Sequence, residues 1–251
     1  MPTGRKRTKT TRGDPKNKSS SVLLSDYRTC WLVRNDEPAV DLEAKGEVFS
    51  VHKSILTAHS EYFKSCLGKS FAEGVENKIQ FDDIEPQYLG YYLGLAASFS
   101  SIVPHIAPRV KDRIETPIRD FIEVYKLCDR FMSAEMAEFM HECIEAASTK
   151  GHCGLWHAGP RDEALQKRLM REFADGYEAL QLEHPPQAAM GAKMVDEFCE
   201  GVSFAAWDAY GDDVIDRPRF VSAVSKGFAR KLIEASNSRS KLKRKFLGGS
   251  N

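Results

Sequence analysis

The stretch Phe49-Ser-Val-His-Lys-Ser-Ile-Leu-Thr-Ala-His-Ser-Glu-Tyr-Phe63 decides the fold, because the spacing of its apolar residues changes within it from two to three and four. Upstream of this stretch, residues 40–44 alternate apolar and polar side chains, as in a half-buried β-strand. Gly46 predicts a turn, and residues 47–51 predict a second strand that completes a hairpin. The beginning of the quoted stretch is therefore expected to lie in a small sheet.

A helix is expected to follow the hairpin. After His52 the apolar side chains recur at helical spacing, which predicts one amphipathic helix that ends near Gly68. A third strand is predicted around Ile79 and Phe81, and Pro86 is expected to open another helix as a first-turn residue. The stripe of the first helix consists of Ile55, Leu56, His59, Tyr62, Phe63, Cys66 and Leu67.

The rest of the chain is predicted to form helices separated by loops. Residues 99–117 contain three prolines and mixed polarity, which predicts a long exposed loop. Pro185-Pro186 is expected to break a helix. The link at residues 149–161 is short, so the helices after it are expected to pack back on the first part. The later helices are expected to begin near Pro117, Ser133, Asp162 and Pro218.

The composition is that of an ordinary globular protein, with 42% apolar and 29% charged residues among 251. The sequence has no apolar run of about 18 residues, and we expect no membrane-spanning helix. The N-terminal residues do not resemble a secretory signal. The six cysteines lack Cys-x-x-Cys spacing, which favours reduced thiols and an intracellular protein, in the nucleus or the cytoplasm.

The net charge of zero conceals a strong asymmetry along the chain. Residues 1–20 and 226–251 carry net charges of +6 and +7, and the body between them carries −13. Basic ends on an acidic body are typical of interaction segments. They include Arg5-Lys-Arg7 and Lys241-Leu-Lys-Arg-Lys245, which are compatible with nuclear import, with nucleic-acid contact or simply with a solvated tail.

The quoted stretch resembles the signature of BTB/POZ domains, in which a strand ending in Val-His-Lys leads into a helix of the pattern Leu-x-x-x-Ser-x-Tyr-Phe. The resemblance continues at residues 71–76, 79–83 and 124–132, and covers roughly residues 38–147. In its overall character the chain is similar to fungal BTB proteins without zinc fingers. The signature residues are Val51, His52, Leu56, Ser60 and Phe63.

This resemblance implies an α+β fold, a small BTB/POZ-like sheet with a helical cluster, followed by an all-helical C-terminal extension. The chain then divides into a basic arm expected to be disordered (1–21), a BTB/POZ-like domain (22–147), a helical extension (148–236) and a basic tail (237–251).

The resemblance also implies a function in protein–protein interaction. BTB domains commonly form homodimers through the first helix and nearby strands, which points here to Lys53, Ile55, His59 and Tyr62. Lys53 matches a basic position of the dimer-interface pocket in some members, but the acid expected to accompany it falls on Ala39. Some BTB domains bind a cullin ligase scaffold. The acidic motif of cullin binders is absent from residues 88–97, and Ser98-Phe-Ser-Ser replaces the usual Tyr-Thr-Gly.

Catalytic and metal sites are not favoured by the sequence. His52 is expected to be a buried imidazole, and Ser60 is expected to bond to backbone rather than act as a nucleophile. The paired acids Asp82-Asp83 and Asp212-Asp213 fit turns better than chemistry. The densest set of potential zinc ligands is expected to be incidental, and neither a metal nor a cofactor is predicted; it comprises His141, Cys143, His152, Cys153 and His157.

The leading hypothesis is a non-catalytic adaptor or scaffold that associates with itself and with other proteins. One alternative is a nuclear regulatory protein whose basic ends contact nucleic acid, although no nucleic-acid-binding motif is present. A second alternative is a substrate adaptor of a cullin ligase.

Overall fold

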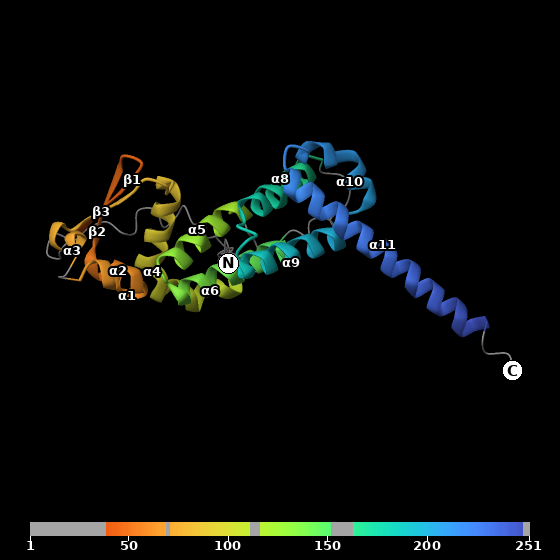
Figure 1. Ribbon diagram of the computed structural model, residues 1–251, viewed down its shortest axis with the longest axis horizontal. Helices are drawn as coiled ribbons and strands as arrows, with labels where there is room; N and C mark the ends of the chain where they lie inside the picture. Colours follow the sequence, from red (N-terminus) through yellow and green to blue (C-terminus); the bar gives the residue numbers. More distant parts are fainter. Residues whose placement is uncertain (1–38, 69–70, 111–115, 152–162, 248–251) are drawn as a thin grey trace, which may run out of the picture.

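The computed structural model describes residues 39–68, 71–110, 116–151 and 163–247 (Figure 1). A three-stranded sheet lies at one end and the last helices lie at the other, with α5 and α6 between them. The elements are β1 (Ala39–Ala44), β2 (Glu47–His52), α1 (Lys53–His59), α2 (Glu61–Cys66), α3 (Ala72–Glu76), β3 (Lys78–Phe81), α4 (Pro86–Val110), α5 (Ile118–Arg130), α6 (Ala134–Ala146), a π-helical turn (Ala147–Gly151), α8 (Glu163–Ala179), α9 (Pro185–Gly201), α10 (Phe204–Tyr210), a 3-10 turn (Gly211–Val214) and α11 (Pro218–Leu247).

The sheet has the strand order β2-β1-β3. The antiparallel β1–β2 pair places Leu42 opposite Phe49, and β3 joins β1 in parallel. The hairpin turns at Lys45 and Gly46, which both have positive φ, as a two-residue turn between twisted strands requires. The alternation of apolar residues thus predicted the burial correctly, since Val40, Leu42 and Ala44 are fully buried.

The single helix predicted up to Gly68 is wrong, because Ser60 divides it into α1 and α2. Ser60 adopts an extended backbone with φ −131° and ψ 119°. Its hydroxyl accepts a hydrogen bond from the Phe63 amide at 3.1 Å and so caps α2. The apolar spacing continues across the break, which is why the pattern indicated one helix.

The exposed loop predicted over residues 99–117 is also wrong. Helix α4 continues through Val110 and includes Pro104 and Pro108, while residues 111–115 lie outside the described ranges. The first half of α4 is anchored in the core through fully buried Leu89 and Leu93. A proline removes one helical hydrogen bond, and a helix already held by packing can continue past it.

The helical extension packs against the sheet-bearing part through α5 and α8. Gly176 of α8 allows this close approach, because a Cβ there would lie 2.7 Å from Cγ2 of Ile118 at the start of α5. One hydrophobic core runs from the strands to Val224 of α11. Helices α9 and α10 were not predicted, and Pro185-Pro186, expected only to break a helix, forms the first turn of α9.

Helix α11 contains 30 residues and extends well beyond the body of the molecule (Figure 1). It passes from the predicted extension into the basic tail and remains helical to Leu247. The predicted basic arm, residues 1–21, lies outside the described residues. In the described part of the chain, no helix combines the length and apolar character needed to cross a membrane.

Candidate interaction surfaces

The signature residues of the quoted stretch form the core of the sheet-bearing part. Val51, Leu56, Phe63 and Ser60 are at most 1% exposed, and His52 is 5% exposed. Phe63 lies 4.8 Å from Phe131, measured between ring centroids. These positions therefore specify packing, and the surface for partners must come from their neighbours.

Several aromatic rings surround Phe131, which ends α5. The centroid distances from its ring are 5.0 Å to Tyr92, 5.4 Å to Phe81 and 5.5 Å to Tyr62. The Tyr92 hydroxyl shares a buried hydrogen bond of 2.8 Å with Ser133, and burial raises the pKa of Tyr92 strongly. This cluster connects α2, α4, α5 and β3, and so fixes the position of the first two helices.

The surface that we name the α1–α2 face comprises the predicted residues Lys53, Ile55, His59 and Tyr62, together with Ser54 and Ala58. The four predicted residues are all half-buried, whereas Ser54 and Ala58 are exposed. Ile55 and His59 lie one helical turn apart, with Ala58 beside His59. The structure thus adds two small exposed residues that the sequence interpretation missed.

The side chain of Lys53 forms a hydrogen bond to the end of α2. Its Nζ donates a hydrogen bond of 2.7 Å to the carbonyl oxygen of Leu67, at the C-terminal end of α2. A cation at this position interacts favourably with the helix dipole. Ala39 lies opposite His52 in the sheet register, next to Lys53, so this position supplies no carboxylate to a charged pocket.

His59 and Tyr62 each contribute one side of their ring to the core. His59 packs edge-on against Phe99 of α4 with a centroid distance of 5.2 Å. Tyr62 packs against Phe63 and Phe131, and burial is the main cause that raises the pKa of Tyr62. Their remaining surfaces are available to a partner, and because the buried sides fix the rings, binding would order few additional side chains.

A second apolar surface lies at α3 and was not predicted. Phe71 and Val75 are 55% and 73% exposed and stand one helical turn apart. The sequence signal for this surface is the spacing of four between two large apolar residues in a segment that has no other large apolar residue.

The segment of α4 that lacks the acidic motif of cullin binders is largely internal, because Leu89, Tyr92 and Leu93 are buried.

The potential zinc ligands are only partly within the described residues. Cys143 is buried in α6, and burial raises the pKa of its thiol to about 12. His141 lies at the surface, with Nδ1 3.9 Å from Glu145 Oε1. No three potential ligands converge among the described residues, and residues 152, 153 and 157 are not described.

One acid of each pair, Asp83 and Asp213, contacts a basic side chain. Arg130 donates a hydrogen bond of 2.6 Å to Asp83, and this contact lowers the pKa of the Asp83 carboxyl. Asp213 lies 3.9 Å from Nζ of Lys167 and 4.0 Å from Arg171. These contacts give the acids a role in holding neighbouring elements together.

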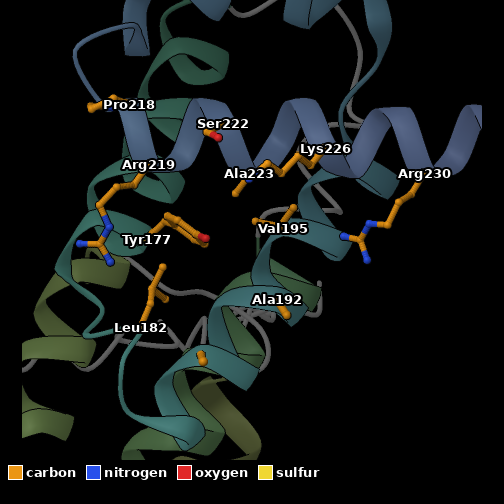
Figure 2. A pocket seen from close by; sticks show the side chains of 11 residues that line it. Tyr177, Leu182, Ala192, Val195, Pro218, Arg219, Ser222, Ala223, Lys226 and Arg230 are labelled. Carbon is orange, nitrogen blue, oxygen red and sulfur yellow. The ribbon is translucent and has the colours of Figure 1, made fainter.

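A groove of about 730 Å³ lies between α9 and α11 (Figure 2). We name it the α9–α11 groove. Figure 2 shows α11 with Ser222, Ala223, Lys226 and Arg230 on one side, and α9 with Ala192 and Val195 on the other. The sequence interpretation missed it. The complete lining is Tyr177, Leu182, Ala188, Ala192, Val195, Pro218, Arg219, Ser222, Ala223, Lys226 and Arg230.

Comparison with known families adds one match. Residues 36–94 match the family of the BTB/POZ domain, a segment that includes all three strands and the first part of α4. The match ends before residues 124–132, where the sequence resemblance was expected to continue. A search of curated proteins finds no match. Residues 36–94 of this chain therefore match the BTB/POZ domain, and BTB/POZ domains are generally protein–protein interaction modules.

Proposed function

We propose that this chain is a non-catalytic adaptor or scaffold that associates with itself through the α1–α2 face. The BTB/POZ match at residues 36–94 supports an interaction module. Self-association is supported by the composition of the α1–α2 face. In this face exposed Ser54 and Ala58 lie beside half-buried Ile55 and His59. Small residues let the helix of a second copy approach closely, and the apolar side chains beside them gain from burial.

A symmetric dimer would bring the two α1 helices together across a twofold axis. The same residues then occur on both sides, so a charge added at Ala58 faces its own copy. Like charges in a desolvated interface are strongly unfavourable. The fold of the single chain should be unaffected, because Ala58 is exposed.

Light scattering on Ala58→Glu tests this proposal, with Ala235→Glu as the matched control. Ala235 is also an exposed helical alanine, but it lies on α11, far from α1 (Figure 1). We expect the wild-type protein and Ala235→Glu to form dimers, and Ala58→Glu to be a monomer with unchanged circular dichroism. Dimers of equal stability in all three proteins would exclude the α1–α2 face.

The polar groups beside this face support a non-catalytic role. The Ser60 hydroxyl bonds to two backbone groups and is fully buried, so it is not presented to a substrate. The Lys53 ammonium is directed to the Leu67 carbonyl. A nucleophile, a base and an orienting group facing one cavity would be needed for most hydrolytic chemistry. These side chains instead stabilise the fold.

Contact with nucleic acid is the second candidate, favoured by the course of α11. This helix leaves the body and continues to Leu247 through the basic stretch 241–245 (Figure 1). A basic helix that extends into solvent is able to neutralise phosphates and release counterions. Such a function also fits a nuclear location. DNA binding that weakens steeply with salt, and that is lost when residues 241–245 are neutralised, would support it.

Cullin recruitment remains the third candidate. The BTB/POZ match is compatible with it, whereas the buried residues of α4 offer no acidic contact in the expected segment. Purified cullin that binds the wild-type protein in a pull-down, and fails to bind an α3 variant such as Val75→Asp, would establish it through another surface.

A further inference from the structure

We propose that the α9–α11 groove binds an acidic amphipathic helix of a partner protein. The groove has a regular construction. Ala188, Ala192 and Val195 lie on one face of α9 at helical spacing, and Ser222, Lys226 and Arg230 lie on α11 at intervals of four residues. Figure 2 shows Val195 close to α11 and Ala192 farther from it, so α9 and α11 diverge and the two stripes line a wedge-shaped hollow.

Gly227 lies where α11 packs on α9, next to the groove residues Val195 and Lys226. A Cβ at this position would lie 2.9 Å from Sγ of Cys199 and 3.1 Å from Cγ1 of Val195. The missing side chain therefore lets α11 come close to α9. Tyr177 and Leu182 close one end of the channel, where Gly191 leaves room for both side chains. The groove is a product of tight helix packing, and its shape does not depend on a partner.

The floor of the groove suits an apolar helix face. Its small residues include Ala188, Ala192, Ala223 and Ser222, which allow a guest helix to approach closely. The half-buried side chain of Leu182 offers apolar contact surface, whereas Val195 is only 3% exposed. The lining of α11 extends from Pro218 to Arg230, which corresponds to about 18 Å at 1.5 Å per residue. This length accommodates about three turns of a helix.

The rim of the groove is basic. Its lining contains Arg219, Lys226 and Arg230 and no acid. Arg219 donates hydrogen bonds to the carbonyl oxygens of Leu180 at 2.7 Å and Glu178 at 3.2 Å, and its Nε lies 3.9 Å from Oε2 of Glu178, so its guanidinium is fixed at the edge and already paired with an acid. Arg230 lies 3.2 Å from Asp196.

Lys226 lies on α11 between Arg219 and Arg230 and is exposed. Within the described ranges it forms no ion pair with an acid. An acid on a partner would thus meet a cation that is not already neutralised.

The charges around the groove indicate which kind of partner fits it. A helix with apolar residues on one side and Asp or Glu at the flanks matches both the floor and the rim. The protruding half of α11 from a second copy does not match, since residues 238–247 contain five bases and no acid. A nucleic acid would match the rim and leave the apolar floor without a partner.

The groove does not depend on self-association. The α1–α2 face lies at the opposite end of the molecule, near the sheet (Figure 1). A failure of peptide binding would leave the dimer proposal untouched, and a monomeric wild-type protein would leave the groove untouched. Measuring the oligomeric state and the peptide binding of each variant therefore distinguishes a failure of the dimer proposal from a failure of the groove proposal.

The test uses the full-length protein and a fluorescein-labelled peptide of about four helical turns, with Leu and Ala on one face and Glu on the other. A twin peptide has Lys in place of every Glu. Fluorescence anisotropy is expected to show binding of the Glu peptide at least about tenfold tighter than binding of the Lys peptide, with affinity that falls as salt increases.

Two variants with matched controls test whether the Glu peptide binds in the α9–α11 groove. Ala192→Trp fills the floor and is expected to weaken binding at least about tenfold, whereas Ala235→Trp outside the groove leaves it unchanged. Lys226→Glu is expected to weaken binding about fivefold or more, whereas Lys226→Arg retains it.

Each remaining outcome overturns the proposal. Absence of binding, equal binding of the two peptides, or unchanged binding by Ala192→Trp with an intact melting temperature would show that the groove does not bind an acidic helix.

Discussion

The Ser60 hydroxyl donates a hydrogen bond of 2.6 Å to the carbonyl oxygen of Phe131, a residue 71 positions later in the chain. The same hydroxyl accepts from the Phe63 amide and caps α2. One buried oxygen therefore joins the α1–α2 break to the end of α5. It also explains why a small polar residue stands in the middle of an apolar stripe.

Ser60→Ala is expected to lower the free energy of unfolding by about 1–3 kcal/mol, because the cap and the bond to Phe131 are both lost. Denaturant unfolding measures the change. Ser65→Ala is the control, since Ser65 is exposed on α2 outside the α1–α2 face and its replacement should change the free energy of unfolding by no more than about 0.5 kcal/mol. Equal effects at the two positions would show that the Ser60 contacts contribute no stability.

Phe63→Asp is expected to unfold the sheet-bearing part. The ring is fully buried against Phe131, and an unpaired carboxylate there has no compensating partner. Loss of the thermal transition and of the near-ultraviolet circular dichroism signal would report it. Phe63→Leu keeps an apolar side chain and should fold with reduced stability. A normal melting temperature for Phe63→Asp would contradict the assignment of this residue to the core.

Gly176→Ala is expected to destabilise the junction between the two parts by about 1–3 kcal/mol, because the new Cβ overlaps Cγ2 of Ile118 at 2.7 Å. This exceeds the gain of about 1 kcal/mol that alanine brings in a helix. Gly211→Ala is the control, since its nearest neighbour, Trp207, would be at 3.4 Å and its φ is −60°. A stabilised Gly176→Ala protein would mean that α5 and α8 are not packed as described.

Alkylation of the thiols should follow burial. Burial raises the pKa of Cys199 to about 11 and that of Cys143 to about 12, so their reactive thiolates are scarce at pH 8. Cys66 is half-buried and should react before them in the folded protein. Iodoacetamide labelling read by mass spectrometry measures each site, and the rates should converge after denaturation. Early labelling of Cys143 would contradict its buried position.

The strands could be predicted from the sequence because their pattern is local. Val40, Leu42 and Ala44 alternate with polar residues, and Gly46 marks the turn. The signature residue Phe63 was likewise placed correctly in the core. In each case the residue type and its near neighbours contain the information.

The break at Ser60 depends on a contact with Phe131 that no local spacing reveals. The continuation of α4 past Pro104 depends on the anchoring of its first half in the core. The α9–α11 groove lies beside the close contact of α11 with α9 at Gly227, and the sequences of the two helices do not reveal that contact. Four residues of the α1–α2 face came from a family resemblance, and the structure added Ser54 and Ala58. The role of this face remains a prediction.

The mass of the wild-type protein in solution tests the central claim most directly. Sedimentation equilibrium over a wide range of concentrations should give twice the chain mass of 28.2 kDa, with dissociation on dilution governed by one dimerisation constant. A strict monomer at the highest attainable concentration would contradict self-association through the α1–α2 face.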